Sequence, residues 1–114
     1  RLSSAASRAI ERERAGGRIM VSSISAWEIA MLVQANRLDL SMDVLAWLGA
    51  AARIEGLEFV PVDNLTAVES RFLPGEFQAD SADRIIVALA RGLGAPLVTA
   101  DARIRDYPHV ATIW

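Results

Sequence analysis

One stretch of sequence decides the fold: Asp80-Ser-Ala-Asp83-Arg84-Ile-Ile-Val-Ala-Leu-Ala90, which continues through Gly92-Leu-Gly94 into Pro96-Leu-Val-Thr99-Ala-Asp101. It predicts a capped helix that begins at Ser81, a glycine stop, a short buried strand, and a carboxylate where that strand ends. In an open α/β sheet such strand ends share one edge, and that edge carries the chemistry. Acidic side chains gathered there without a basic partner are typical of a metal site.

The same reading of the rest of the chain predicts strands that alternate with helices. Strands are expected at 18–22, 57–62, 96–99 and 110–114, and helices at 4–15, 25–35, 41–56, 64–72, 81–93 and 101–106. Ser25 and Glu28 match a capping box at the start of the second helix, and Asn64 is the expected cap of the fourth. The alternation predicts an α/β fold with a mainly parallel sheet of four strands flanked by helices.

Length and composition narrow the class of protein. A chain of 114 residues predicts one domain, and a hydrophobic content of 53% excludes a disordered chain. The formal net charge of -2 gives no footprint of nucleic-acid binding by itself, although a basic patch can coexist with an acidic site. No apolar run reaches the roughly 18 residues of a membrane span, so no membrane partner is expected. The lack of cysteine fits a reducing compartment, and we expect a cytoplasmic protein.

Three acidic residues share one local setting. Glu28, Asp83 and Asp101 each lie just after a predicted strand or at the start of the next helix. Their charges would repel one another unless a cation neutralised them, and oxygen ligands favour Mg²⁺ or Mn²⁺. Each also has a structural interpretation, because Glu28 fits a capping box, Asp83 follows an Asp80 cap, and Asp101 can cap its own helix. Taken singly, capping explains each acid better; taken together, the three favour a metal site.

Other polar residues give weaker indications. Arg84 either orients Asp83, contacts a phosphate or forms a structural ion pair. His109 is the only histidine and is expected in a surface loop, which leaves no plausible Ser-His-Asp arrangement. The arginines of the first helix are interleaved with glutamates, so a solvated face is favoured over a phosphate-binding patch.

Four motifs, in their order along the chain, resemble the PIN domain of VapC-type toxins. They are Ile24-Ser-Ala-Trp-Glu28-Ile-Ala30, Leu73-Pro74-Gly75, Asp80-Ser-Ala-Asp83-Arg84-Ile-Ile-Val-Ala88 and Leu97-Val-Thr99-Ala-Asp101. Each motif is short, but the ordered set is specific and covers nearly the whole chain.

The resemblance implies a metal-dependent endoribonuclease, the toxin of a toxin–antitoxin pair, which hydrolyses RNA phosphodiester bonds with Mg²⁺ or Mn²⁺. It maps the family's catalytic, metal-binding acids to Glu28, Asp83 and Asp101, with a weaker claim for Asp80 and a supporting hydroxyl at Thr99. It further implies a cognate antitoxin protein as partner and a homodimer.

The sequence departs from the family at its start. Family members begin with a central strand that ends in an aspartate ligand, and these 114 residues enter after it. We therefore expect a single PIN-like domain over 1–114 that is N-terminally incomplete as written, with a gap at the centre of its sheet. The alternative function is a catalytically silent PIN-like domain that binds an antitoxin or another protein partner. A phosphoacceptor domain is disfavoured, because it needs a late lysine and the chain has none.

Overall fold

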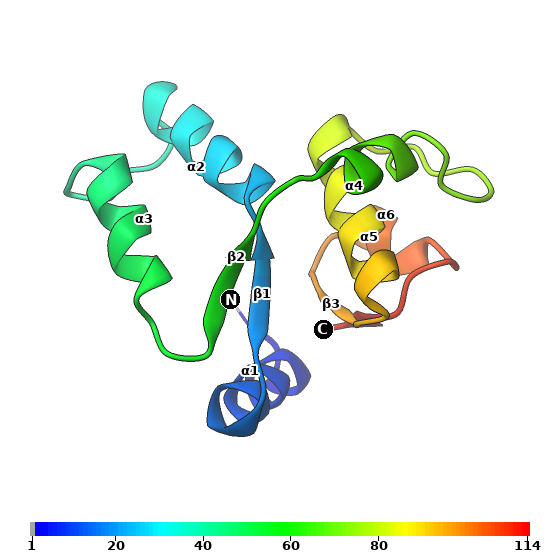
Figure 1. The fold of residues 1–114 in the computed structure, drawn as a ribbon, viewed down its shortest axis with the longest axis horizontal. Coiled ribbons are helices and arrows are strands. Elements are labelled where there is room, and N and C mark those ends of the chain that lie inside the picture. The colour runs from blue at the N-terminus through cyan, green and yellow to red at the C-terminus, as the bar shows by residue number, and fades with distance from the viewer. Residues whose placement is uncertain (1) are drawn as a thin grey trace. The chain divides into compact units, whose positions relative to one another are not determined.

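The computed structural model describes residues 2–114 and contains the predicted alternation of helices and strands (Figure 1). The elements in chain order are α1 (Ser4–Gly16), β1 (Ile19–Ser22), α2 (Ile24–Gln34), α3 (Val44–Ala52), β2 (Leu57–Val60), α4 (Asn64–Glu69), α5 (Ser81–Leu93), β3 (Leu97–Val98), α6 (Ala102–Asp106) and β4 (Thr112–Ile113). The predicted α/β class is confirmed, although most strands and helices are shorter than their sequence patterns.

The strands pair in parallel, as predicted. β1 pairs with β2, with Ile19 opposite Leu57, and β3 pairs with β4, with Leu97 opposite Thr112. Helices α2 and α3 connect the first pair, and α6 connects the second, since parallel strands need a crossover connection. Within residues 2–114 these are two two-stranded sheets. The predicted gap at the centre of one larger sheet stays a prediction.

The chain divides into two compact units, which are described separately. Unit 1 comprises the chain up to Glu11 together with Val62–Trp114, and unit 2 is Arg12–Pro61. In unit 2, α2 packs against α3 and against β1. None of the hydrophobic side chains of Arg12–Pro61 is fully buried, and Leu45 of α3 is 78% exposed.

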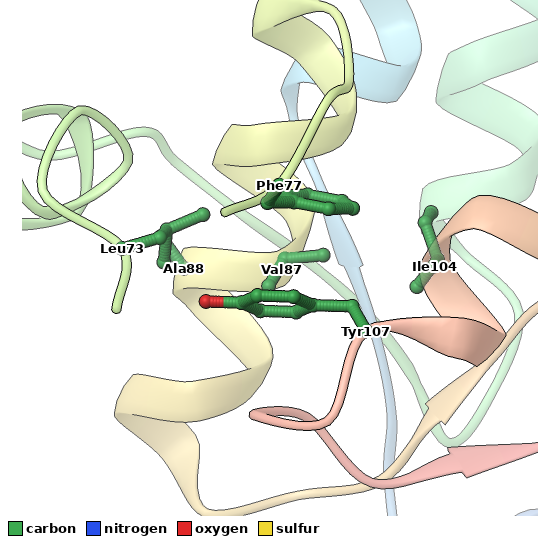
Figure 2. Packing of buried hydrophobic residues seen from close by; sticks show 6 residues of the cluster. All are labelled: Leu73, Phe77, Val87, Ala88, Ile104 and Tyr107. Carbon is green, nitrogen blue, oxygen red and sulfur yellow. The ribbon is translucent and has the colours of Figure 1, made fainter. Parts of the chain in front are cut away.

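Unit 1 holds the hydrophobic core (Figure 2). The core consists of side chains from the loop before α5, from α5 itself, and from the end of α6, namely Leu73, Phe77, Val87, Ala88, Ile104 and Tyr107. The rings of Phe77 and Tyr107 stack with centroids 4.5 Å apart, and Val87 behind them has no exposed surface. This packing fixes α5 and α6, the two helices whose first turns carry the predicted acids of this unit.

The start of α2 corrects one prediction. The helix begins at Ile24, so Ser25 lies inside it and the predicted capping box of Ser25 with Glu28 is wrong. The helix starts early because of Ser22, the last residue of β1. Its Oγ accepts a hydrogen bond from Ile24 N at 3.2 Å. The chain thus enters the helix directly from the strand, without a capping side chain from Ser23.

Two further helices start at aspartate caps that differ from the predicted starts. Asp43 caps α3 and accepts from Ala46 N at 3.1 Å, so α3 starts later than predicted. Asp63 caps α4 and accepts from Thr66 N at 2.8 Å, so the predicted Asn64 cap is wrong. In both cases the carboxylate accepts a hydrogen bond from a backbone N–H of the first turn. Its negative charge also interacts favourably with the positive end of the helix dipole.

No helix within residues 2–114 combines the length and the apolar character that crossing a membrane requires.

Candidate functional site

The first turn of α5 carries two of the predicted acids. Asp80 is the N-cap, and its Oδ1 accepts a hydrogen bond from Asp83 N at 2.9 Å. The capping interpretation of Asp80 is therefore confirmed. The Asp83 side chain is only 18% exposed, and its Oδ2 forms an ion pair with Arg103. Asp80 thereby fixes the backbone from which Asp83 projects.

The end of β3 carries the third acid of unit 1. Asp101 is the N-cap of α6, and its Oδ1 accepts from Arg103 N at 2.8 Å. Thr99 stands two residues earlier, and its Oγ1 accepts a hydrogen bond from Asp101 N at 3.1 Å. This hydrogen bond holds the backbone of Asp101 at the start of α6, and a role of the Thr99 hydroxyl in the site stays a prediction.

Asp83 and Asp101 face one cation. Nη2 of Arg103 lies 3.7 Å from Oδ2 of Asp83 and 3.6 Å from Oδ2 of Asp101. Two acids from separate helices therefore meet around a single point. Sequence reasoning missed Arg103, because nothing in the pattern distinguishes it from Arg105 on the same short helix.

The electrostatic environment of Asp83 is that of a crowded acidic site. The pKa of its carboxyl is raised above the ordinary value, first by burial and then by the negative charges of Asp80 and Asp101. Arg103 acts in the opposite direction and lowers it. Burial and the two neighbouring carboxylates thus outweigh the guanidinium in their effect on the pKa of Asp83.

The contacts of Arg84 show which of its three predicted roles, orienting Asp83, binding a phosphate or holding the structure, it has in the fold. Its Nε donates to the carbonyl of Ser70 at 2.8 Å, and its Nη1 donates to the carbonyl of Phe77 at 2.7 Å. The guanidinium also lies over the Phe77 ring, 5.9 Å from the centroid. Arg84 thus holds the loop between α4 and α5 and acts structurally, although its partners are backbone carbonyls and not a carboxylate.

Glu28 and His109 occupy separate settings. Glu28 is half-buried in α2 of unit 2, and its participation in a site stays a prediction. His109 is exposed in the loop before β4, with its ring edge on Tyr107 at 5.3 Å, so its predicted place in a surface loop is confirmed.

The donor atoms decide which metal the site fits. Within residues 2–114 no group of three or more His, Cys, Asp or Glu side chains lies close enough to hold a metal ion. Asp83 and Asp101 offer two carboxylates and neither nitrogen nor sulfur. Mg²⁺ is commonly held by one or two carboxylates together with waters and substrate phosphates. The pair therefore fits Mg²⁺ or the similar Mn²⁺ and does not fit zinc.

Comparison with known proteins identifies the family of the chain. The family model "PIN domain" matches residues 1–110. Ribonuclease VapC22 of Mycobacterium tuberculosis is 39% identical over 116 aligned residues, which cover 100% of this chain and 85% of that protein. The chain belongs to the PIN-domain family and is of the VapC type.

Proposed function

We propose that the protein is a metal-dependent endoribonuclease, the toxin of a type II toxin–antitoxin system, which hydrolyses RNA phosphodiester bonds. The observation that carries the proposal is the convergence of Asp83 and Asp101 on one point in a PIN fold. The name of the similar Mycobacterium tuberculosis protein, a ribonuclease, supports the choice of substrate.

The residues of the site have distinct roles in this proposal. Asp83 and Asp101 would hold Mg²⁺ or Mn²⁺, and Glu28 is a further proposed ligand. Asp80 holds the first turn of α5 in place, and Thr99 orients Asp101. When bound, the divalent cation would supply an activated water and neutralise charge on the phosphate. The partial burial of Asp83 strengthens these interactions, since charges act more strongly away from water.

RNA cleavage by matched variants tests the proposal. With Mg²⁺ present, the wild-type protein should cleave a single-stranded RNA, whereas Asp83→Asn and Asp101→Asn should cleave at least about a hundredfold more slowly, because even loss of a residue that only supports a ligand costs 10- to 100-fold. Asp106→Asn is the control, because Asp106 is exposed at the end of α6. Full Mg²⁺-dependent activity in Asp83→Asn would refute the assignment.

The second candidate is a catalytically silent PIN-like domain that binds an antitoxin. It is favoured by the absence, in residues 2–114, of a group of three acids able to hold a metal. Calorimetric titration with Mg²⁺ separates the two candidates. Binding that is lost in Asp83→Asn supports the nuclease, and the absence of binding supports the silent domain.

We also propose a cytoplasmic homodimer that binds a cognate antitoxin. The support is an exposed apolar surface on α2, where Trp27 is 58% and Met31 43% exposed. These side chains line an open depression together with Ala30 and Gln34. Light scattering of the protein alone and with the antitoxin tests both associations. A monomer that also fails to bind the antitoxin contradicts this proposal.

A further inference from the structure

We propose that Arg103 is a built-in counter-ion of the metal site, so that a divalent cation must displace its guanidinium before it can bind to Asp83 and Asp101. The inference rests on the proposed function, since it concerns the same pair of carboxylates. It adds that a side chain of the same protein lowers the affinity of this site for the metal.

The first argument is the choice of oxygen atoms. Asp101 uses Oδ1 to cap α6, and its Oδ2 is the atom that faces Arg103 at 3.6 Å. Asp83 likewise turns Oδ2 to the same Nη2 atom, at 3.7 Å. A metal held by both aspartates would therefore compete with the guanidinium for the same carboxylate oxygens.

The second argument is electrostatic. A divalent cation and a guanidinium repel each other at contact distance, so the two cannot share the site. The carboxylates of Asp83 and Asp101 lie near the same guanidinium nitrogen, so their negative charges attract a cation to the same place. Arg103 supplies a cation to both carboxylates from within the chain.

The third argument is that Arg103 is held loosely enough to leave. Its side chain is 60% exposed, whereas that of Asp83 is 18% exposed. Both of its ion-pair distances exceed the roughly 2.7–2.9 Å of a strong charge-assisted hydrogen bond. Exposed ion pairs of this kind are weak, so displacement reduces metal affinity without preventing binding.

Mn²⁺ binding to the full chain tests the inference without a measurement of activity. Free Mn²⁺ is followed by electron paramagnetic resonance during titration of the wild-type protein, Arg103→Gln, Arg103→Lys and Arg105→Gln. Arg105→Gln is the matched control, because it removes the same charge from an exposed position on α6. Arg103→Gln should bind Mn²⁺ about three- to tenfold more tightly than wild type, as expected for loss of exposed ion pairs. Arg103→Lys should remain near wild type, and Arg105→Gln should stay within about twofold of it because screening weakens a more distant charge.

Each outcome decides a different point. Equal or weaker Mn²⁺ binding by Arg103→Gln overturns the inference and leaves the proposed function standing. An equal gain in Arg105→Gln also overturns it, because the effect would then be one of net charge. Lack of Mn²⁺ binding by every protein overturns both this inference and the metal dependence of the proposed function. Circular dichroism of each variant establishes that the fold is intact, and loss of binding in the double variant with Asp83→Asn places the metal at this site.

Discussion

Nε of Arg84 donates a 2.8 Å hydrogen bond to the carbonyl of Ser70, which lies 14 residues earlier in the chain. Its Nη1 donates to the carbonyl of Phe77, and the hydroxyl of Tyr107 donates to the carbonyl of Pro74 between them. The loop from α4 to α5 is therefore held at three of its backbone carbonyls, those of Ser70, Pro74 and Phe77. Because Arg84 follows Asp83 directly, the same contacts hold the first turn of α5, from which Asp83 projects.

Arg84→Lys is expected to destabilise the protein by about 2 kcal/mol, since hydrogen bonds from a charged donor are each worth about 1.5–3 kcal/mol and an ammonium group cannot replace the planar fork. The free energy of unfolding in urea measures the loss. Arg71→Lys is the control, because Arg71 is exposed just after α4. Equal unfolding midpoints for wild type and Arg84→Lys would show that the planar guanidinium group of Arg84 is not needed for the stability of the fold.

Tyr107→Phe should cost about 1 kcal/mol, because it removes the hydroxyl that donates to Pro74 and keeps the ring stacked on Phe77. Tyr107→Ala should cost about 3–5 kcal/mol, since the buried ring and its stacking are lost as well. Thermal unfolding of the two variants shows which of them loses more stability. Similar losses in both would mean that the hydroxyl, and not the ring, carries the contribution.

The pKa of Asp63 is lowered, mainly because its carboxylate accepts the backbone N–H of Thr66. A carboxyl with a lowered pKa stabilises the folded state above its ordinary pKa of about 4, and this contribution is lost as the pH falls through the lower folded-state value. Asp63→Ala should therefore unfold at a lower temperature than wild type at pH 7. The gap should narrow below about pH 4. A gap that does not change with pH would exclude the charged cap as its cause.

Some features of the fold were predictable because they depend on neighbours in sequence. The Asp80 cap and the end of α5 at Gly94 are local, and Gly94 adopts a left-handed φ of +62° that favours glycine. The start of α2 was not predictable from its S-x-x-E pattern, because Ser22 belongs to a strand whose pairing with β2 is non-local.

The candidate site shows the same division. Asp83 was predicted from its place in the first turn of a helix and Asp101 from its place at the end of a strand, since both junctions belong to a recurring α/β topology. The contact of Arg103 with these acids was not predicted. Helix α6 carries two arginines, Arg103 and Arg105, and only the packing of the helix through the buried Ile104 decides which of them faces the acids. The place of Glu28 in the site and the single-domain organisation of the chain both depend on long-range arrangement and stay predictions.

Asp83→Asn separates a functional carboxylate from a structural one. The pKa of Asp83 is raised, so the folded protein holds its proton more tightly than the unfolded chain does. Such a group stabilises the fold at low pH, and this contribution is lost as the pH rises through the folded-state pKa. At pH 7 the ionised carboxylate therefore weakens the fold. In metal-free buffer Asp83→Asn should melt at the wild-type temperature or up to about 4 °C above it.

The difference should shrink below about pH 4, where the carboxyl is protonated in the unfolded chain as well. The sign is opposite to that expected for Asp63, which serves as the internal comparison in the same pH series. Residues that weaken a fold are typical of functional sites, where activity and stability conflict. A melting temperature that falls on Asp83→Asn would contradict this. It would mean that the carboxylate is kept for the first turn of α5 and its ion pair with Arg103, as the capping interpretation holds.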